Sequence, residues 1–130
     1  FMKKKLIATI CLICISIPIA VSAASTGGSK KIDSQHAIMG TLNVSGGSGN
    51  AVTTWEGHES NCGHGLYSYI EAVNQYGNKI GSGSEHFNWN AGYDGSQAYA
   101  SLYNGNAYYF NSRHTTASNS TSLYLQLSRY

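Results

Sequence analysis

This chain of 130 residues has few cysteines, a single proline and no large excess of either charge. Charged residues make up 11% of the sequence, and its single proline is Pro18. Two of the three cysteines, Cys11 and Cys14, fall in an apolar N-terminal run, which leaves Cys62 as the one thiol beyond it. An intramolecular disulfide framework is therefore excluded for residues after that run, although disulfides are common in small exported domains.

The N-terminal residues form three zones of distinct composition. Lys3, Lys4 and Lys5 precede the uncharged run 6–21, and the small residues Ser22-Ala23-Ala24 follow it. A basic, an apolar and a small-residue zone in this order are typical of a secretory signal peptide. The run is also shorter than the about 20 residues that cross a bilayer, so an uncleaved anchor is the weaker alternative. We predict a signal peptide over 1–24, of bacterial Gram-positive type, and a secreted, extracellular product.

Cleavage after residue 24 changes the charge that the remaining chain carries. Five basic residues then stand against six acidic ones, for a net charge of −1 with histidine neutral. A basic footprint for nucleic acid is thus missing, and no nucleic-acid partner is expected. No stable membrane span is expected after cleavage. The lone Cys62 permits a dimer through an intermolecular disulfide, because an unpaired cysteine in an exported chain can pair between copies.

The remaining composition favours strands over helices. Leu, Ile, Val and Phe are few, Gly, Ser, Thr and Asn are many, and ten tyrosines and two tryptophans are present. Short alternating runs between turn residues predict an all-β fold, an antiparallel two-sheet sandwich of about seven short strands over 36–130. A partly open barrel is the alternative. We expect a flexible segment over 25–35, and we expect most tyrosines in the core, because aliphatic residues are scarce there.

Turn residues place the expected strands along the chain. Alternation predicts strands over 36–44, 50–55, 66–75 and 123–128, with 45–49 as a glycine-rich turn. Gly77-Asn78 predicts a two-residue hairpin in which Val73 lies opposite Ser82. Asn104-Gly105 predicts a type I′ hairpin that places Tyr99 opposite Phe110.

The densest group of potential metal ligands lies in one short loop. His58, Cys62 and His64 offer two imidazoles and a thiolate, which suit zinc or copper. The spacing is not a strong zinc signature, and a solvated polar loop is the alternative interpretation. Cys62 beside His64 also has the composition of a nucleophile with its base, but no third residue is placed to orient the base. Zinc is the cofactor expected if this loop binds a metal, and no cofactor is the default expectation.

Aromatic residues suggest a binding face as an alternative to a core role. The candidates for such a face are Tyr67, Tyr69, Phe87, Trp89, Tyr99, Tyr103, Tyr108 and Tyr109. Faces of this kind bind sugars, peptides or lipid headgroups. Trp89 and Tyr93, in the polar segment 88–96, are the expected exposed ligand-binding residues. Acidic residues for a small hydrolase are present, but the sequence pairs no two of them across a cleft.

Several short motifs resemble those of lactococcin 972-type bacteriocins. These motifs are Val44-Ser45-Gly46-Gly47, Trp55, Tyr67-Ser68-Tyr69 and Ala98-Tyr99-Ala100-Ser101, followed by Gly105-Asn106-Ala107-Tyr108-Tyr109. The resemblance implies a secreted, unmodified antibacterial β-sandwich that acts through a cell-wall precursor. It transfers no binding residue to this chain.

Together these patterns predict a small secreted protein without enzymatic activity. Its expected role is extracellular binding to a cell-wall or cell-surface component. The most specific version of this hypothesis is a bacteriocin-like action. A metal-binding protein that uses the loop with His58, Cys62 and His64 is the second hypothesis, and a small hydrolase is the third.

Overall fold

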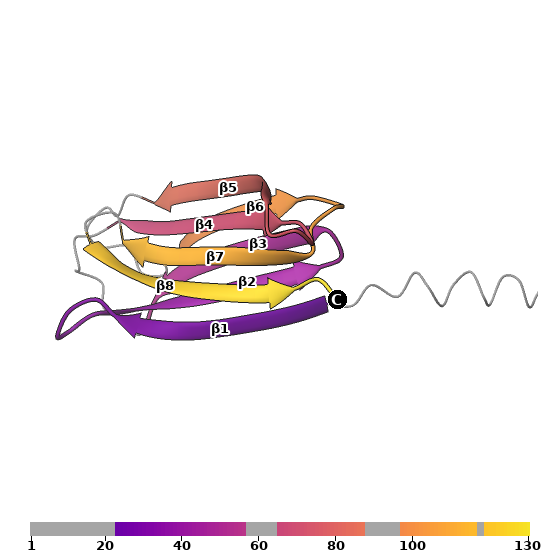
Figure 1. The fold of residues 1–130 in the computed structure, drawn as a ribbon. Coiled ribbons are helices and arrows are strands. Elements are labelled where there is room, and N and C mark those ends of the chain that lie inside the picture. Colours follow the sequence, from indigo (N-terminus) through magenta and orange to yellow (C-terminus); the bar gives the residue numbers. More distant parts are fainter. Residues whose placement is uncertain (1–22, 57–64, 88–96, 117–118) are drawn as a thin grey trace, which may run out of the picture.

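Two four-stranded antiparallel sheets face each other across one core (Figure 1). The computed structural model describes residues 23–56, 65–87, 97–116 and 119–130. In these ranges the elements are β1 (Ala23–Lys31), β2 (Ala37–Ser45), β3 (Ser48–Trp55), β4 (Leu66–Val73), β5 (Lys79–Phe87), β6 (Gln97–Tyr103), β7 (Tyr109–Thr116) and β8 (Asn119–Ser128). The predicted all-β class and the two-sheet arrangement are confirmed, and the described part contains eight strands instead of about seven.

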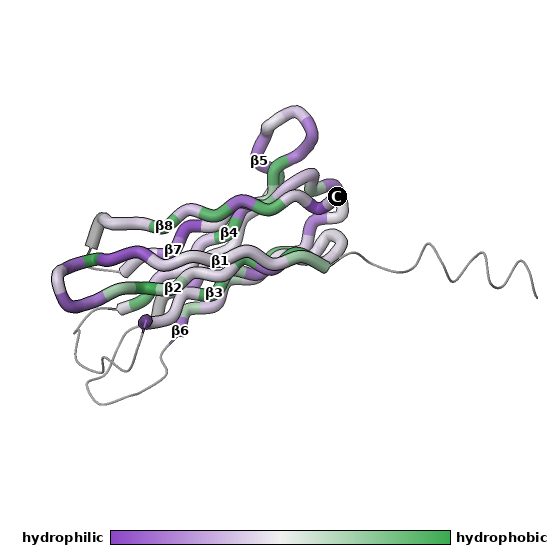
Figure 2. The backbone as a smooth tube through the Cα atoms, turned by 90° about the horizontal axis from the view of Figure 1, so that it is seen from below, coloured by the Kyte–Doolittle hydropathy of each residue, from purple (hydrophilic) through white to green (hydrophobic). Residues whose placement is uncertain are grey.

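The strand order places edge strands of the two sheets beside each other. One sheet runs β1-β2-β3-β6 and the other runs β5-β4-β7-β8, and Figure 2 shows them as two layers. Along one side β5 lies so close to β6 that a Cβ on Gly83 would sit 2.7 Å from the Ser101 carbonyl oxygen. The Glu85 carboxylate also accepts a hydrogen bond from the Tyr99 amide across this gap. Glycine therefore lets the two sheets approach closely where their edges meet.

The segment expected to be flexible is in large part a strand, and that prediction is wrong. Residues 23–31 pair with 37–45 along the whole length of β1. Ser, Thr and Gly bury little apolar surface, so their composition suggested disorder. At a sheet edge, however, backbone hydrogen bonds to the neighbouring strand are available to any non-proline residue. Residues 1–22 lie outside the described ranges, so the signal peptide over 1–24 stays a prediction.

Aliphatic side chains fill most of the core, and the expectation that tyrosines fill it is wrong. The buried apolar residues described are Ile32, Ile38, Leu42, Val44, Ala51, Leu66, Ile70, Ala72, Val73, Ala98, Ala100, Ala107 and Phe110. Phe110 is the aromatic member of this set, and its ring faces Gly49, where a Cβ would lie 2.7 Å away. Alanine and glycine on the inner faces bring the sheets close together, which leaves little room for a second large ring and its hydroxyl group.

Two of the predicted turns lie where the sequence placed them. Ser45 pairs with Ser48 across Gly46-Gly47, and Gly46 takes a φ of 58°. The β4–β5 hairpin also forms, but its register differs from the prediction because Val73 pairs with Lys79 and a five-residue loop joins the strands. The offset is two residues from Leu66 to Ala72, so these side chains stay on their expected faces, and the register shifts at Val73.

The predicted hairpin at Asn104-Gly105 is wrong. Strand β6 pairs with β3, whereas β7 pairs with β4 and β8, so the chain crosses from one sheet to the other here. Gly46 and Gly77 are the residues with positive φ in the described ranges, so Gly105 does not adopt the type I′ conformation. Long-range pairing with β3 therefore outweighs the local turn preference.

Candidate functional site

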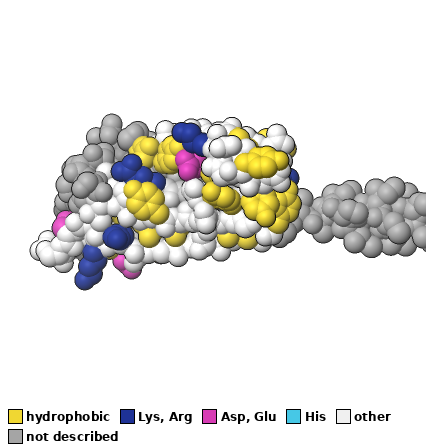
Figure 3. All heavy atoms as spheres, in the orientation of Figure 1, with side chains coloured by type: hydrophobic (Ala, Val, Ile, Leu, Met, Phe, Trp, Pro, Cys, Tyr) yellow, Lys and Arg dark blue, Asp and Glu magenta, His cyan; other side chains and the backbone are white. Residues whose placement is uncertain are grey.

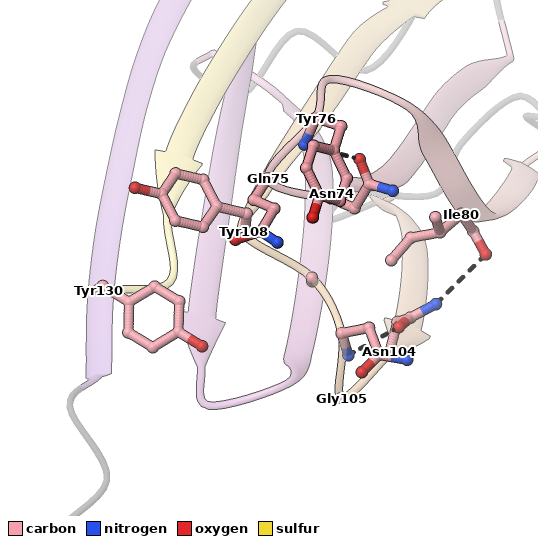
Figure 4. Close-up of a pocket in the computed structure, with 10 residues that line it drawn as sticks. Asn74, Gln75, Tyr76, Ile80, Asn104, Gly105, Tyr108 and Tyr130 are labelled. Atoms are coloured by element: carbon pink, nitrogen blue, oxygen red, sulfur yellow. Dashed lines mark hydrogen bonds between the residues drawn. The ribbon is translucent and has the colours of Figure 1, made fainter.

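Two loops and the C-terminal residue meet at one end of the sandwich around an open pocket (Figure 4). Its volume is about 590 Å³. The lining residues are Asn74, Gln75, Tyr76, Ile80, Asn104, Gly105, Asn106, Ala107, Tyr108 and Tyr130. They come from the β4–β5 loop, the start of β5, the crossing between β6 and β7, and the residue pair that follows β8. We call this the end pocket.

Asn74 shapes the first loop of the end pocket. Its Oδ1 accepts hydrogen bonds from the backbone amides of Tyr76 and Asn78, each at 3.0 Å. Gly77 takes a φ of 82°, a conformation that a residue with a Cβ rarely adopts. This small cap makes the loop stand out from the sheet in Figure 2 and holds Tyr76 in water, at 77% exposure.

Asn104 fixes the second loop against the first. Its Oδ1 accepts a hydrogen bond from the Asn106 amide at 2.9 Å, and its Nδ2 donates to the Ile80 carbonyl at 3.2 Å. The Asn104 amide also donates to the Gly47 carbonyl at 2.8 Å. One side chain therefore connects the β6–β7 crossing to β5, while its backbone connects that crossing to the β2–β3 hairpin.

Tyr108 and Tyr130 form one wall of the end pocket. Their ring centroids lie 5.8 Å apart at an interplanar angle of 49°, and both rings are exposed. The Tyr108 carbonyl accepts a hydrogen bond from the Arg129 amide at 3.0 Å. The Arg129 guanidinium lies 5.4 Å from the Tyr130 ring centroid and donates to the Gly105 carbonyl. Arg129 thus stabilises this wall, because its guanidinium contacts the Tyr130 ring and its donor binds the Gly105 carbonyl.

The end pocket combines aromatic rings with amide groups, and no charged side chain belongs to its lining. None of the ten lining residues is acidic or basic. In the described part of the chain, no hydrogen bond occupies the side-chain amides of Gln75 and Asn106. Figure 3 shows a large group of hydrophobic side chains at this end of the molecule. The site can therefore stack on a flat, weakly polar ligand surface and exchange hydrogen bonds with neutral groups.

A second polar cluster lies between the sheets, around a fully buried His114. The Ser112 hydroxyl lies 2.8 Å from His114 Nε2, and Thr53 Oγ1 lies 2.9 Å from Nδ1. Thr53 and Ser68 are 2.6 Å apart, and Ser68 donates to the Ala98 carbonyl at 2.9 Å. The Thr53 hydroxyl directs its one proton to the Tyr67 carbonyl, at 3.0 Å, or to Ser68, so it accepts from Nδ1–H, which leaves Nε2 to accept from Ser112. This orientation keeps the imidazole neutral.

Burial lowers the pKa of His114 from its ordinary 6.5 to about 4, because the charged imidazolium loses its water. A hydrogen bond to the Val52 backbone opposes this shift and is the smaller cause. Serine, threonine and histidine also occur together in hydrolases, but His114 has no exposed surface here. A substrate cannot reach it in this structure, so the cluster has a structural role.

The predicted site residues lie outside the described ranges. His58, Cys62 and His64 fall in 57–64, and Trp89 and Tyr93 fall in 88–96. The predicted zinc loop, the dimer through Cys62 and the exposed aromatic pair therefore stay predictions. Among residues that the structure does describe, no three His, Cys, Asp or Glu side chains group as metal ligands would. In the same residues, no helix has the length and apolarity to cross a membrane.

Sequence reasoning missed both polar clusters. A signal for the buried one existed, because Phe110, Ser112 and His114 alternate along one strand and share its inner face. The end pocket left a weaker signal. Tyr108 was among the aromatic candidates for a binding face, but its partners Tyr76 and Tyr130 come from distant segments that only the fold brings together.

Comparison with known proteins adds no relative. No protein-family model, no curated protein and no solved structure matches this chain. The function must therefore be argued from the geometry of the described residues.

Proposed function

We propose that this chain is a non-enzymatic, extracellular binding protein whose end pocket holds a neutral carbohydrate. The observation that carries the proposal is the set of three exposed tyrosines, Tyr76, Tyr108 and Tyr130, around a lining without charged side chains. The ligand would belong to a cell-wall or cell-surface glycan.

Carbohydrate is favoured by the pairing of rings with amides. A sugar ring presents weakly polar C–H groups on its faces and hydroxyl groups around its rim. Tyrosine offers a rigid ring and a hydroxyl with few rotatable bonds, so little entropy is lost when it stacks on such a face. Asn and Gln amides both donate and accept, which matches hydroxyl groups that do the same. The unoccupied amides of Gln75 and Asn106 provide these partners at the rim.

The geometry also argues for a preformed site. Side-chain hydrogen bonds from Asn74 and Asn104 hold both loops, and Tyr108 and Tyr130 already lie against each other. The volume falls within the about 300–1,000 Å³ of small-molecule sites. A preformed wall reduces the ordering entropy that binding would otherwise lose. The openness of the pocket suits one end or one segment of a longer glycan better than an enclosed small molecule.

Affinity measurements on matched tyrosine variants test the proposal. The purified protein, residues 25–130, is titrated with a panel of soluble neutral polysaccharides by isothermal calorimetry. Against the polysaccharide that binds, Tyr76→Ala and Tyr130→Ala are each expected to weaken affinity at least about fivefold, which corresponds to about 1 kcal/mol of lost contact. Tyr103→Ala is the matched control, because Tyr103 is 75% exposed and does not line the end pocket.

Two results would reject the proposal. One is the absence of binding to every neutral polysaccharide in the panel. The other is an equal loss of affinity in Tyr103→Ala and in the two pocket variants, because the effect would then not belong to the end pocket. An action on other bacteria is a separate consequence of extracellular binding, and growth-inhibition assays with the same purified protein measure it.

A further inference from the structure

A second pocket lies on the outer face of β4, β7 and β8, apart from the end pocket. Its volume is about 610 Å³. Tyr69 and Glu71 come from β4, Asn111 and Arg113 from β7, and Tyr124 and Gln126 from β8. On the face seen in Figure 3, a smaller group of hydrophobic side chains lies beside basic ones, away from the C-terminal end. We call this the sheet pocket.

One row of the sheet pocket is a ladder of hydrogen bonds across three strands. Glu71, Asn111 and Gln126 are neighbours in the strand register. Gln126 Nε2 donates to Asn111 Oδ1 at 3.0 Å, and Asn111 Nδ2 donates to Glu71 Oε1 at 3.1 Å. The Tyr69 hydroxyl donates to Glu71 Oε2 at 3.0 Å. Two donors therefore hold the Glu71 carboxylate in place, and the ladder gives the pocket a fixed polar floor.

The next row holds an arginine between two tyrosines. Arg113 pairs with Tyr69 on one side and with Tyr124 on the other. Its Nε donates to Ser122 Oγ at 2.9 Å, which orients the guanidinium. No acidic side chain in the described ranges lies within ion-pair distance of Arg113. Its guanidinium lies 6.0 Å from the Tyr67 ring centroid, and no hydrogen bond in the described residues occupies its two terminal amino groups, so these can still donate to a ligand. Tyr124 beside it is 70% exposed.

We infer that the sheet pocket binds a sugar that carries one carboxylate. The planar guanidinium of Arg113 matches a carboxylate through two parallel hydrogen bonds. Tyr124 offers a ring face for stacking, and Gln126 and Glu71 offer partners for hydroxyl groups. Arg113 is the one basic side chain in the lining and has no acidic partner in the described ranges, so charge complementarity selects an acidic ligand over a neutral one.

Glu71 restricts the number of negative charges that the ligand can carry. Its carboxylate lines the same pocket and is not paired with Arg113. A singly charged carboxylate can face Arg113 and turn hydroxyl groups toward Glu71. A phosphate monoester carries close to two negative charges at neutral pH, so Glu71 repels it more strongly.

Two ligands that differ in one group test the inference directly. Methyl glucuronide and methyl glucoside differ only in a carboxylate that replaces a hydroxymethyl group. Titration of the folded protein, followed by NMR chemical shifts, is expected to show at least about tenfold tighter binding of the glucuronide at low salt. Arg113→Gln should abolish this difference. Lys30→Gln removes the same charge on β1 and serves as the matched control.

Three further measurements keep the inference falsifiable. Tyr124→Ala should weaken the binding of both sugars, and glucose 6-phosphate should bind more weakly than the glucuronide. Tyr130→Ala in the end pocket should leave glucuronide binding unchanged, which separates this site from the neutral-carbohydrate site. Equal affinity for glucuronide and glucoside, binding of neither, or retention of the difference in Arg113→Gln would each overturn the inference. Tighter binding of the phosphate would overturn it as well.

Discussion

The buried cluster around His114 and the open end pocket differ in whether their polar groups already have partners. Between the sheets, Ser112, His114, Thr53 and Ser68 form a continuous chain of hydrogen bonds closed off from water. At the end of the sandwich, Gln75 and Asn106 keep unoccupied amides beside exposed tyrosine rings. The polar groups around His114 have hydrogen-bond partners within the protein, whereas the side-chain amides of Gln75 and Asn106 face solvent and can still form hydrogen bonds with a ligand.

This difference separates a role in stability from a role in binding. A satisfied, buried network loses free energy when any member is removed, because its neighbours are left without partners away from water. An exposed site loses little stability on mutation but loses the contacts that it makes with a ligand. Variants of the buried cluster should therefore lower the free energy of unfolding and leave the ligand affinity of the folded protein unchanged. Variants of the end pocket should lower the affinity and leave the stability nearly unchanged.

The largest effect on stability is expected from His114→Ala. The change removes a buried ring, takes away the hydrogen-bond partner of the Ser112 hydroxyl and removes one of the hydrogen bonds of Thr53. We expect a loss of about 3–5 kcal/mol in the free energy of unfolding, as for other large buried side chains cut to alanine. Urea denaturation measures it. A loss below 1 kcal/mol would show that the network does not stabilise the fold, and the fraction that stays folded should bind carbohydrate as the wild type does.

The second effect is a loss of stability in acid that leaves affinity unchanged. His114 has a pKa of about 4 when folded and an ordinary pKa of 6.5 when unfolded. Between these values the unfolded chain binds more protons, so the His114 contribution to the free energy of unfolding falls with pH from about 6.5 to about 4. The full loss is about 3 kcal/mol. Denaturation curves across this range measure it.

The matched control for the acid effect is His114→Gln, which should show a flatter dependence over the same pH range. The ten residues that line the end pocket include no aspartate, glutamate or histidine. Affinity for a neutral carbohydrate should therefore stay constant there while the protein is folded. A stability curve that rises toward acid would contradict the assignment of His114 as a neutral, buried group.

Asn104→Ala should show an intermediate effect, because Asn104 links the pocket to the fold. The substitution removes the hydrogen bonds to the Ile80 carbonyl and from the Asn106 amide. We expect a loss of about 1–2 kcal/mol of stability from two hydrogen bonds and about fivefold weaker carbohydrate binding. Asn104→Asp keeps the acceptor but loses the donor, so the stability of this variant should lie between that of the wild type and that of Asn104→Ala. Unchanged affinity in Asn104→Ala would mean that the loop does not need this link to hold the ligand.

His36→Ala should change the stability of the protein least, because His36 lies near the surface whereas His114 is buried. His36 Nδ1 lies 2.7 Å from Asp33 Oδ2 near the surface, and this contact lowers the pKa of Asp33. Solvent screens such pairs, so the urea midpoint should move far less than in His114→Ala. A change as large as that of His114→Ala would show that burial does not decide which histidine stabilises the fold.

Alternation predicted the strands well because it reports which side of a strand is buried. Ile38, Leu42 and Val44 were placed on one face from the sequence, and all three are buried. Strand pairing was less predictable, because it depends on contacts between distant segments. Asn104-Gly105 favours a local hairpin, yet β6 pairs with β3, in the other sheet from β7. The composition of β1 gave no sign of pairing, because edge pairing uses the backbone.

Binding residues were harder still to predict than strand pairs. The tyrosines indicated a binding face in general, but their positions at the ends of strands decide where that face forms. Tyr76, Tyr108 and Tyr130 meet only because the β4–β5 loop, the β6–β7 crossing and the residues after β8 end on the same side. The spacing of these tyrosines in the sequence does not indicate that they line one pocket.

The most direct test of the central claim is a map of backbone amide chemical shifts during titration with a neutral oligosaccharide. We expect the largest changes at 74–78, 104–108 and Tyr130, with His114 and its hydrogen-bonded neighbours unaffected. Changes confined to other parts of the chain, or no saturable change with any neutral oligosaccharide, would contradict the assignment of the end pocket as the carbohydrate site.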